Sequence, residues 1–472
     1  MEINQPLKIK LLSYLLISAA GFSYLVLPWN AGVSVPIFAI IQFLCLYFLT
    51  PKKKPLLMFI PIFILALNFF ISANEMWRAT NILVIVVLYS VMALLMVDDF
   101  PIKEASSRFV FKTLENIVKP LIHFAIPVKW CMEAGKEHTK KVVRILIGIA
   151  ISIPCLMLLL MLLSSADEIF SRNVSGIIDW IANTINPEIF AKIFFGIVVG
   201  FYLFGLLYSV YQPRSEKTGE TKSRKGDLII FNILLTSILA VYTIFVVIQF
   251  RYLFAGGSSL PYGLSYTYYA RRGFFELLFL SGVNIFLILI TVWLTKEQTG
   301  KWAKVTKILC CYLCVVTVIL LVSSFYRMWL YNADDGLTRL RFLVFGFLIF
   351  EALGLVFTFV YIIKPKFNIV GIYAVIALTY YLLLNVVPMD RIIARDQIDR
   401  YFKTGNGGID YVVTLSPDAA PEIERLRDCG DSYIVSQVDE YFEYNNDYYS
   451  RDGFHWQSWN LSVSRLWKYA DD

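Results

Sequence analysis

Residues Ser265–Gly282 read SYTYYARRGFFELLFLSG, a tyrosine- and arginine-rich stretch that runs directly into an apolar segment. Charged and aromatic residues beside a hydrophobic run are typical of the end of a helix that crosses a membrane. Arg272 and Glu276 are four residues apart, so they face one another if the stretch is helical. The stretch therefore predicts the polar mouth of a transmembrane helix.

The composition extends this prediction to the whole chain. Of its 472 residues, 58% are hydrophobic and only 17% are charged, whereas soluble domains average about 25% charged residues. Apolar runs of about 18–22 residues recur throughout, the length needed to cross a hydrocarbon core of about 30 Å. We expect an all-α, polytopic helical membrane protein with about eleven transmembrane helices. The expected spans are a first helix ending near Pro28 and then residues 31–49, 55–72, 78–97, 142–164, 190–211, 228–250, 273–295, 304–323, 342–362 and 368–387.

The basic residues of the loops alternate from side to side. The loops on one side of the predicted membrane hold about 25 Lys and Arg, and those on the other about 9. Basic loops stay in the cytoplasm, so we expect a cell membrane protein with a cytoplasmic N-terminus. An odd number of spans then places the C-terminus outside.

Five regions are expected along the chain. Residues 1–97 hold helices 1–4, 98–141 form a cytoplasmic amphipathic segment, and 142–227 hold helices 5–6 and a basic linker. Residues 228–387 hold helices 7–11, and 388–472 form a small extracytoplasmic helical domain. This last region carries 9 Lys and Arg against 16 Asp and Glu, a net charge of −7 in a chain of +7. Its acidic, aromatic-rich character favours a cap folded back over the outer face.

A cluster of charged residues is predicted at the outer mouth. Its members are Arg251, Arg271, Arg272, Glu276, Arg327, Asp334, Asp335, Arg339 and Arg341, those from 327 onward in an exterior loop. Arginine binds carboxylates and phosphates through two parallel hydrogen bonds, so one interpretation is a pocket for an anionic lipid or small anionic ligand. The other is that these arginines reach lipid headgroups and pair with Asp334, Asp335 and the acidic tail.

Glu351 and Asn284 fall inside predicted spans. An ionisable group at the centre of a bilayer costs several kcal/mol unless it is paired or neutralised, so Glu351 is a candidate functional residue. The alternative is a protonated glutamate that stabilises helix packing. Asn284 is interpreted as one of several asparagines that hydrogen-bond between helices.

Motifs of catalysis are almost absent from the sequence. It contains no Ser-His-acid set, HExxH helix or Gly-rich phosphate loop. We therefore expect no catalytic residues, no cofactor and no metal site, and an enzyme is the less favoured class. The expected partners are the bilayer itself, the anionic ligand above and a membrane protein, but not nucleic acid.

Several motifs resemble a known family. They are Arg251–Phe254, Tyr269–Leu277, Tyr326–Met328, Gly336–Arg341, Leu415–Pro421 and Trp456–Leu461. Together they are similar to the bacterial polytopic membrane proteins catalogued as domain of unknown function 4173, with the related 4153. Tyr268 and Asp396 depart from the pattern, which has an acidic residue and Asn there. The resemblance implies a protein of the bacterial envelope and no established activity.

Three functions fit these observations. The favoured one is a non-enzymatic sensing, regulatory or assembly protein with an outward-facing polar site. The alternative is a secondary transporter of a small or anionic substrate, in whose proton-coupled form Glu351 would carry the proton. The third is an enzyme that modifies lipid or envelope components.

Overall fold

In the computed structural model, the chain is built from helices joined by turns. The residues described are 4–26, 31–50, 52–97, 107–134, 187–211, 226–252, 274–295, 298–449 and 455–470, with single positions at 148, 152, 156, 159 and 163. Over these residues no strand occurs. The prediction of an all-α protein is confirmed.

Nine of the described helices are long and apolar enough to cross a membrane. They belong to α1 (Gln5–Gly21), α3 (Phe59–Ile71), α4 (Glu75–Val97), α9 (Pro187–Tyr211), α10 (Leu228–Tyr252), α12 (Phe274–Thr295), α13 (Lys301–Asp335), α14 (Arg339–Ile363) and α15 (Ile369–Val386). A tenth apolar helix, α2 (Ser34–Leu49), is shorter. The chain is thus a polytopic helical membrane protein, while most of the expected span 142–164 lies outside the described residues.

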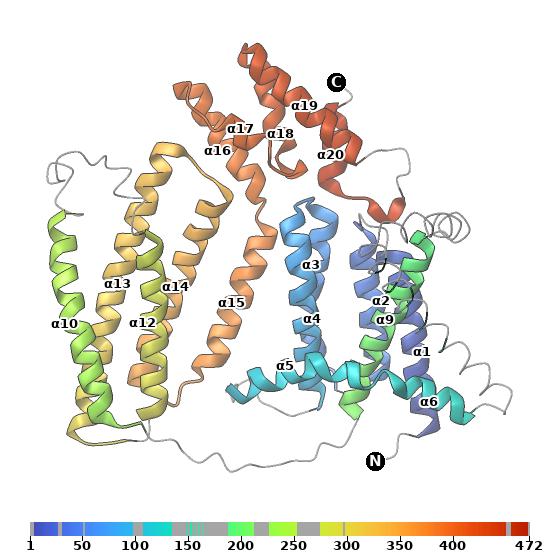
Figure 1. Ribbon diagram of the computed structural model, residues 1–472, viewed down its shortest axis with the longest axis horizontal. Coiled ribbons are helices and arrows are strands. Elements are labelled where there is room, and N and C mark those ends of the chain that lie inside the picture. The colour runs from blue at the N-terminus through green and yellow to red at the C-terminus, as the bar shows by residue number, and fades with distance from the viewer. Residues whose placement is uncertain are drawn as a thin grey trace.

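The spanning helices form two groups that stand side by side (Figure 1). The first group contains α1–α4 and α9, and the second contains α10 and α12–α14. Helix α15 contacts α14 in one group and α3 in the other, so it joins them. Each group has its own apolar core, centred on residues such as Phe204 in the first and Leu320 in the second.

Buried asparagines fasten α15 to the first group. Asn81 of α4 donates to Asn385 Oδ1 of α15 at 2.7 Å and to Asn68 Oδ1 of α3 at 3.3 Å. Asn68 donates to the backbone carbonyl of Asn385 at 2.9 Å. Amide side chains inside a bilayer are stable when they bond to one another, so these contacts fix how the three helices pack.

Two shorter helices, the first of them amphipathic, lie across the lower ends of the spanning helices (Figure 1). They are α5 (Ser107–Ile122) and α6 (Ala125–Ala134), and Figure 1 shows them on the side where the chain begins. Helix α5 buries Asn116, which donates to the Ser90 carbonyl at 3.0 Å, and it exposes Leu114 and Val118. An exposed apolar face on a helix in this position is suited to lipid contact.

Helix α13 corrects one sequence prediction. Residues 326–341 were expected in an exterior loop, but α13 continues as one helix to Asp335, and α14 begins at Arg339. At 1.5 Å per residue its 35 residues reach roughly 52 Å, well beyond a 30 Å core. No Gly or Pro interrupts residues 301–335, and the helix ends where Gly336 adopts a φ of 74°. The charged residues are therefore held on rigid helix ends.

Residues 389–470 form a helical unit, here called the C-terminal cap. It contains α16 (Met389–Thr404), α17 (Ile409–Val412), α18 (Ala420–Ile423), α19 (Ser432–Tyr448) and α20 (Leu461–Ala470). The cap has its own apolar core, in which residues such as Ile398, Val412 and Val438 are fully buried. It covers the ends of the spanning helices opposite to α5 and the N-terminus (Figure 1).

Candidate functional site

Only part of the predicted outer-mouth cluster lies within the described residues. Glu276 is exposed in the first turn of α12. Arg327 is buried within α13, with 4% of its surface exposed. Arg271, Arg272 and the side chain of Arg251 lie outside the described residues. The arginine-lined mouth as a whole therefore stays a prediction.

The guanidinium of Arg341 bonds to groups at the turn between α13 and α14. This group donates to the Asp335 carboxylate at 2.9 Å and to the Gly336 carbonyl, and it lies 3.8 Å from the centre of the Tyr331 ring. Asp334 and Asp335 are exposed at the end of α13. These contacts secure the turn between α13 and α14, and they neutralise Arg341.

Arg339 lies at the centre of a buried polar network between the cap and the spanning helices. Its Nε and Nη2 donate to Asp390 at 2.8 and 2.6 Å, and Asp390 begins α16 of the cap. The same carboxylate accepts bonds from Asn74 Nδ2 at 3.0 Å and from the Ser416 N–H and Oγ at 3.1 and 2.5 Å. The Asp390 side chain is fully buried, whereas a third of Arg339 (33%) remains exposed.

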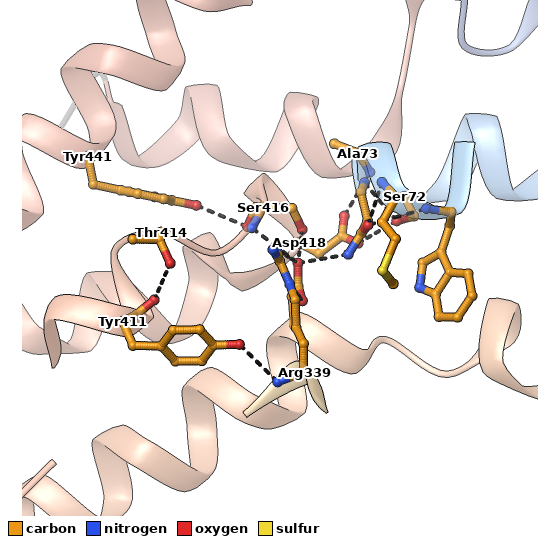
Figure 2. Close-up of polar contacts among 12 residues, drawn as sticks. Ser72, Ala73, Arg339, Tyr411, Thr414, Ser416, Asp418 and Tyr441 are labelled. Atoms are coloured by element: carbon orange, nitrogen blue, oxygen red, sulfur yellow. Dashed lines mark hydrogen bonds and ion pairs between the residues drawn. The ribbon is translucent and has the colours of Figure 1, made fainter. Parts of the chain in front are cut away.

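A second carboxylate attaches the cap to the turn between α3 and α4. Asp418 accepts bonds from Ser72 Oγ at 2.5 Å and from the Ala73 N–H at 2.9 Å. Figure 2 shows Asp418 and Ser416 between this turn on one side and Tyr411 and Tyr441 on the other. Burial raises the pKa of Asp418, although the hydrogen bonds it accepts oppose that shift.

The cap also satisfies carbonyls that helix ends leave unpaired. Asn460 Nδ2 donates to the Phe69 and Ser72 carbonyls at the end of α3, both at 2.8 Å. Arg400 and Gln397 of α16 donate to carbonyls in the last residues of α13. Because the last four carbonyls of a helix lack intrahelical partners, these bonds make the cap a fitted part of the membrane unit.

A groove opens beside this network. Its volume is about 550 Å³, and its walls come from the first turn of α4, the start of α14, the segment 413–417 and one face of α19. The residues that line it are Ala73, Asn74, Glu75, Met76, Arg339, Val413, Thr414, Leu415, Ser416, Pro417, Gln437, Glu440, Tyr441, Tyr444, Asn445, Tyr448 and Tyr449. This volume lies within the range of small-molecule sites, and an occupant would touch both the cap and the spanning helices.

The two intramembrane candidates lie close together on α12 and its neighbours. Glu351 of α14 is 4% exposed and accepts a bond from Ser281 of α12 at 2.7 Å. One turn further along α12, Asn284 accepts a bond from Tyr242 of α10 at 2.9 Å. The interhelical role expected of Asn284 agrees with this contact. Glu351 fits either of its two interpretations.

Sequence reasoning missed the residues that organise the site. Neither Asp390 nor Asp418 was singled out as a candidate site residue. Ser416 begins a 3₁₀ turn with Pro417 in its first position, but the Asp418 side chain bonds to a turn 345 residues away. Two carboxylates in a short acidic tail gave no local signal that they would be buried.

A comparison with protein-family models matches residues 59–426 to a domain of unknown function (DUF4153). The matched region runs from α3 through Asp390 and Asp418, and it stops before α19 and the Trp456–Leu461 motif. No curated protein and no solved structure matches the chain. The relation to family 4173 stays a prediction.

Proposed function

The chain belongs to the family described as domain of unknown function (DUF4153), and we propose that it is a non-enzymatic binding protein of the bacterial cell membrane. In this proposal the groove takes a small ligand, and its occupancy alters how the C-terminal cap sits on the spanning helices. Sensing or regulation of a membrane partner then follows from the change in the cap.

One observation carries the proposal. The walls of the groove come from two parts of the molecule, α19 of the cap and the first turns of α4 and α14. A ligand that contacts both parts binds the docked state more tightly than a displaced one. Such differential affinity is what allows a ligand to shift a conformational equilibrium.

The buried network beside the groove links a change in the groove to the spanning helices. Ser416 lines the groove and donates to Asp390, and Asp390 holds Arg339 at the start of α14. Displacement of the 413–417 segment would therefore reach a spanning helix through three adjoining residues.

Filling the groove tests the proposal without knowledge of the ligand. Thr414 is exposed in the groove, and a T414W variant should occupy the space that a ligand needs. The full chain in lipid nanodiscs is analysed by native mass spectrometry, with T404W as the control. Thr404 is also exposed and bonds to the carbonyl four residues earlier, but it lies outside the groove.

The proposal predicts a bound small molecule in the wild type and in T404W, and its loss from T414W. It also predicts faster amide exchange in segment 413–417 when the ligand is removed. If no small molecule accompanies the wild type, and lipid or metabolite extracts leave the exchange of this segment unchanged, the groove is not a binding site.

A proton-coupled transporter is the second candidate, because Glu351 is buried among helices and bonds to Ser281. The test places the E351Q variant in proteoliposomes that contain a trapped pH dye. Amines, sugars or amino acids are added outside, and the dye reports proton movement. Loss of substrate-driven proton movement in E351Q, but not in the control E276Q on exposed Glu276, would favour transport. If both variants and the wild type move protons equally, the role of Glu351 is to stabilise helix packing.

The orientation forms part of the proposal. The basic loops support a cytoplasmic N-terminus, and the cap lies at the opposite end of the helices (Figure 1). Fusions of alkaline phosphatase and of a fluorescent protein to the C-terminus decide this point. Active phosphatase supports an exterior cap, and a fluorescent fusion without phosphatase activity contradicts it.

A further inference from the structure

We propose that the groove recognises an ammonium group, supplied either by a free amine or by the ethanolamine headgroup of a lipid. This inference rests on the proposed binding function and names its ligand class. It replaces the anionic ligand that the sequence suggested, because the arginine at the groove is already neutralised.

The charge of the groove favours a cation. Its lining contains Glu75, Glu440 and Arg339. Arg339 is paired with the buried carboxylate of Asp390 at 2.6 Å, so the two charges cancel. Two carboxylates on exposed residues remain, one from α4 and one from α19. These two carboxylates attract an ammonium ligand and repel a phosphate, while the charge of the half-buried Arg78 near Glu75 offsets part of theirs.

Tyrosine rings supply the second element of cation recognition. Residues 437, 440, 441, 444 and 448 recur at helical spacing, so one face of α19 carries Gln437, Glu440 and three tyrosines into the groove. The rings of Tyr444 and Tyr448 are stacked at 15°, with centroids 6.4 Å apart, and both are exposed. Aromatic faces bind ammonium groups through their ring quadrupole.

Hydrogen bonds position these groups. Tyr448 Oη donates to Glu75 Oε1 at 3.0 Å, which ties the aromatic face of α19 to the carboxylate on α4. Gln437 Nε2 donates to Asp410 at 2.8 Å. The Gln437 Oε1 atom is buried and accepts no bond within the described part of the chain. A buried acceptor without a partner is costly, and a small displacement of the Gln437 side chain that lets an ammonium N–H reach Oε1 would relieve that cost.

The position of the groove explains why a lipid is one of the two sources. Glu75 begins α4 and Arg339 begins α14, so the groove lies where spanning helices leave the membrane. Headgroups occupy that level of a bilayer. Free amines reach the same place from the aqueous side.

The test uses the full chain in nanodiscs of phosphatidylglycerol, with calorimetric titration of ethanolamine and putrescine. Glucose and methyl phosphate serve as neutral and anionic probes of similar size. The variants are E75Q and E440Q, with E443Q as the matched control. Glu443 is an exposed glutamate of α19, the helix that also carries Glu440. Its side chain does not line the groove. All three positions are exposed, so the substitutions should leave folding intact.

The inference predicts that an amine binds, that E75Q and E440Q each weaken it at least tenfold, and that E443Q changes it less than twofold. If the amine probes bind in phosphatidylglycerol but are excluded in phosphatidylethanolamine nanodiscs, the lipid headgroup is the natural occupant. If they bind equally in both, the source is a free amine.

Two other outcomes would contradict the inference. Binding of glucose or methyl phosphate that T414W abolishes, without binding of any amine or of phosphatidylethanolamine, overturns this inference and leaves the binding function standing. If no probe binds and no small molecule accompanies the wild type, both the ammonium inference and the proposed binding function are wrong.

Discussion

Replacing Asp390 by asparagine should release the C-terminal cap from the spanning helices. The carboxylate is fully buried and accepts five hydrogen bonds, two from Arg339, one from Asn74 and two from Ser416. Asparagine keeps the volume but loses the charge, and its amide nitrogen faces donors where the second carboxylate oxygen stood. Arg339 is then left without its counter-charge.

The expected free-energy cost of D390N follows from how deeply Asp390 and Arg339 are buried. Removing one partner of a fully buried ion pair costs about 3–5 kcal/mol. Arg339 is one-third exposed and can recover some hydration, so we expect about 2–4 kcal/mol for the docked cap. Since 1.4 kcal/mol is tenfold in an equilibrium constant, local opening should rise roughly 30- to 700-fold.

Amide hydrogen exchange followed by mass spectrometry measures this opening. The peptides that hold the Ala73 and Ser416 amides should lose protection in D390N, because those amides donate to carboxylates at the contact between the cap and the spanning helices. Peptides from α12 should keep theirs.

The matched control is D399N. Asp399 is also a cap aspartate paired with arginine, but both partners are well exposed, at 37% and 41%. Exposed pairs contribute about 1 kcal/mol or less. Equal protection in D390N and D399N, or a loss spread evenly over α12, would refute the reasoning that burial makes the Asp390 contact strong.

Three further predictions concern other contacts. G32A should cost about 2–3 kcal/mol in unfolding of the full chain, because a Cβ would lie 2.2 Å from the Trp459 carbonyl. The control G405A, in open space at a φ of 72°, should cost about 1–2 kcal/mol, and the reverse order would contradict the packing. Because burial raises the pKa of Asp418, its contribution to stability should be lost as pH rises from about 4 through that raised pKa. The stability of the wild type relative to D418N should therefore fall over this range, and a constant difference would oppose the prediction. N81L should lower stability by about 1–2 kcal/mol in detergent thermal unfolding, because it removes three bonds between helices, and an unchanged midpoint would show that they contribute nothing.

The groove and the buried network depend on one another. The network holds α16 and segment 413–417 against α4 and α14, and segment 413–417, α4 and α14 also form walls of the groove. A variant that detaches the cap should therefore also lose ligand. For this reason the binding tests use exposed residues such as Glu75, and the docking tests use the buried Asp390.

The spanning helices could be predicted from the sequence because their signal is local. An apolar run of about 20 residues specifies a helix in a bilayer whatever it packs against, since backbone groups in hydrocarbon must bond within their own segment. The helix ends at Gly336 and Gly430 are local features too, because glycine adopts without strain the positive φ that both show. The one error of this kind, the loop at 326–341, arose because a helix can continue beyond the membrane once another unit covers it.

The contacts that make the site could not be predicted in this way. Asp390 meets Arg339 across 51 residues, and Asp418 meets Ser72 across 346. The sequence by itself determined the membrane class, the helical architecture and the acidic, aromatic character of the tail, because composition and periodicity are properties of short segments. Only the tertiary structure decided which carboxylates are buried, which arginines are neutralised and where a groove remains, because burial and pairing depend on segments that the chain brings together from distant positions.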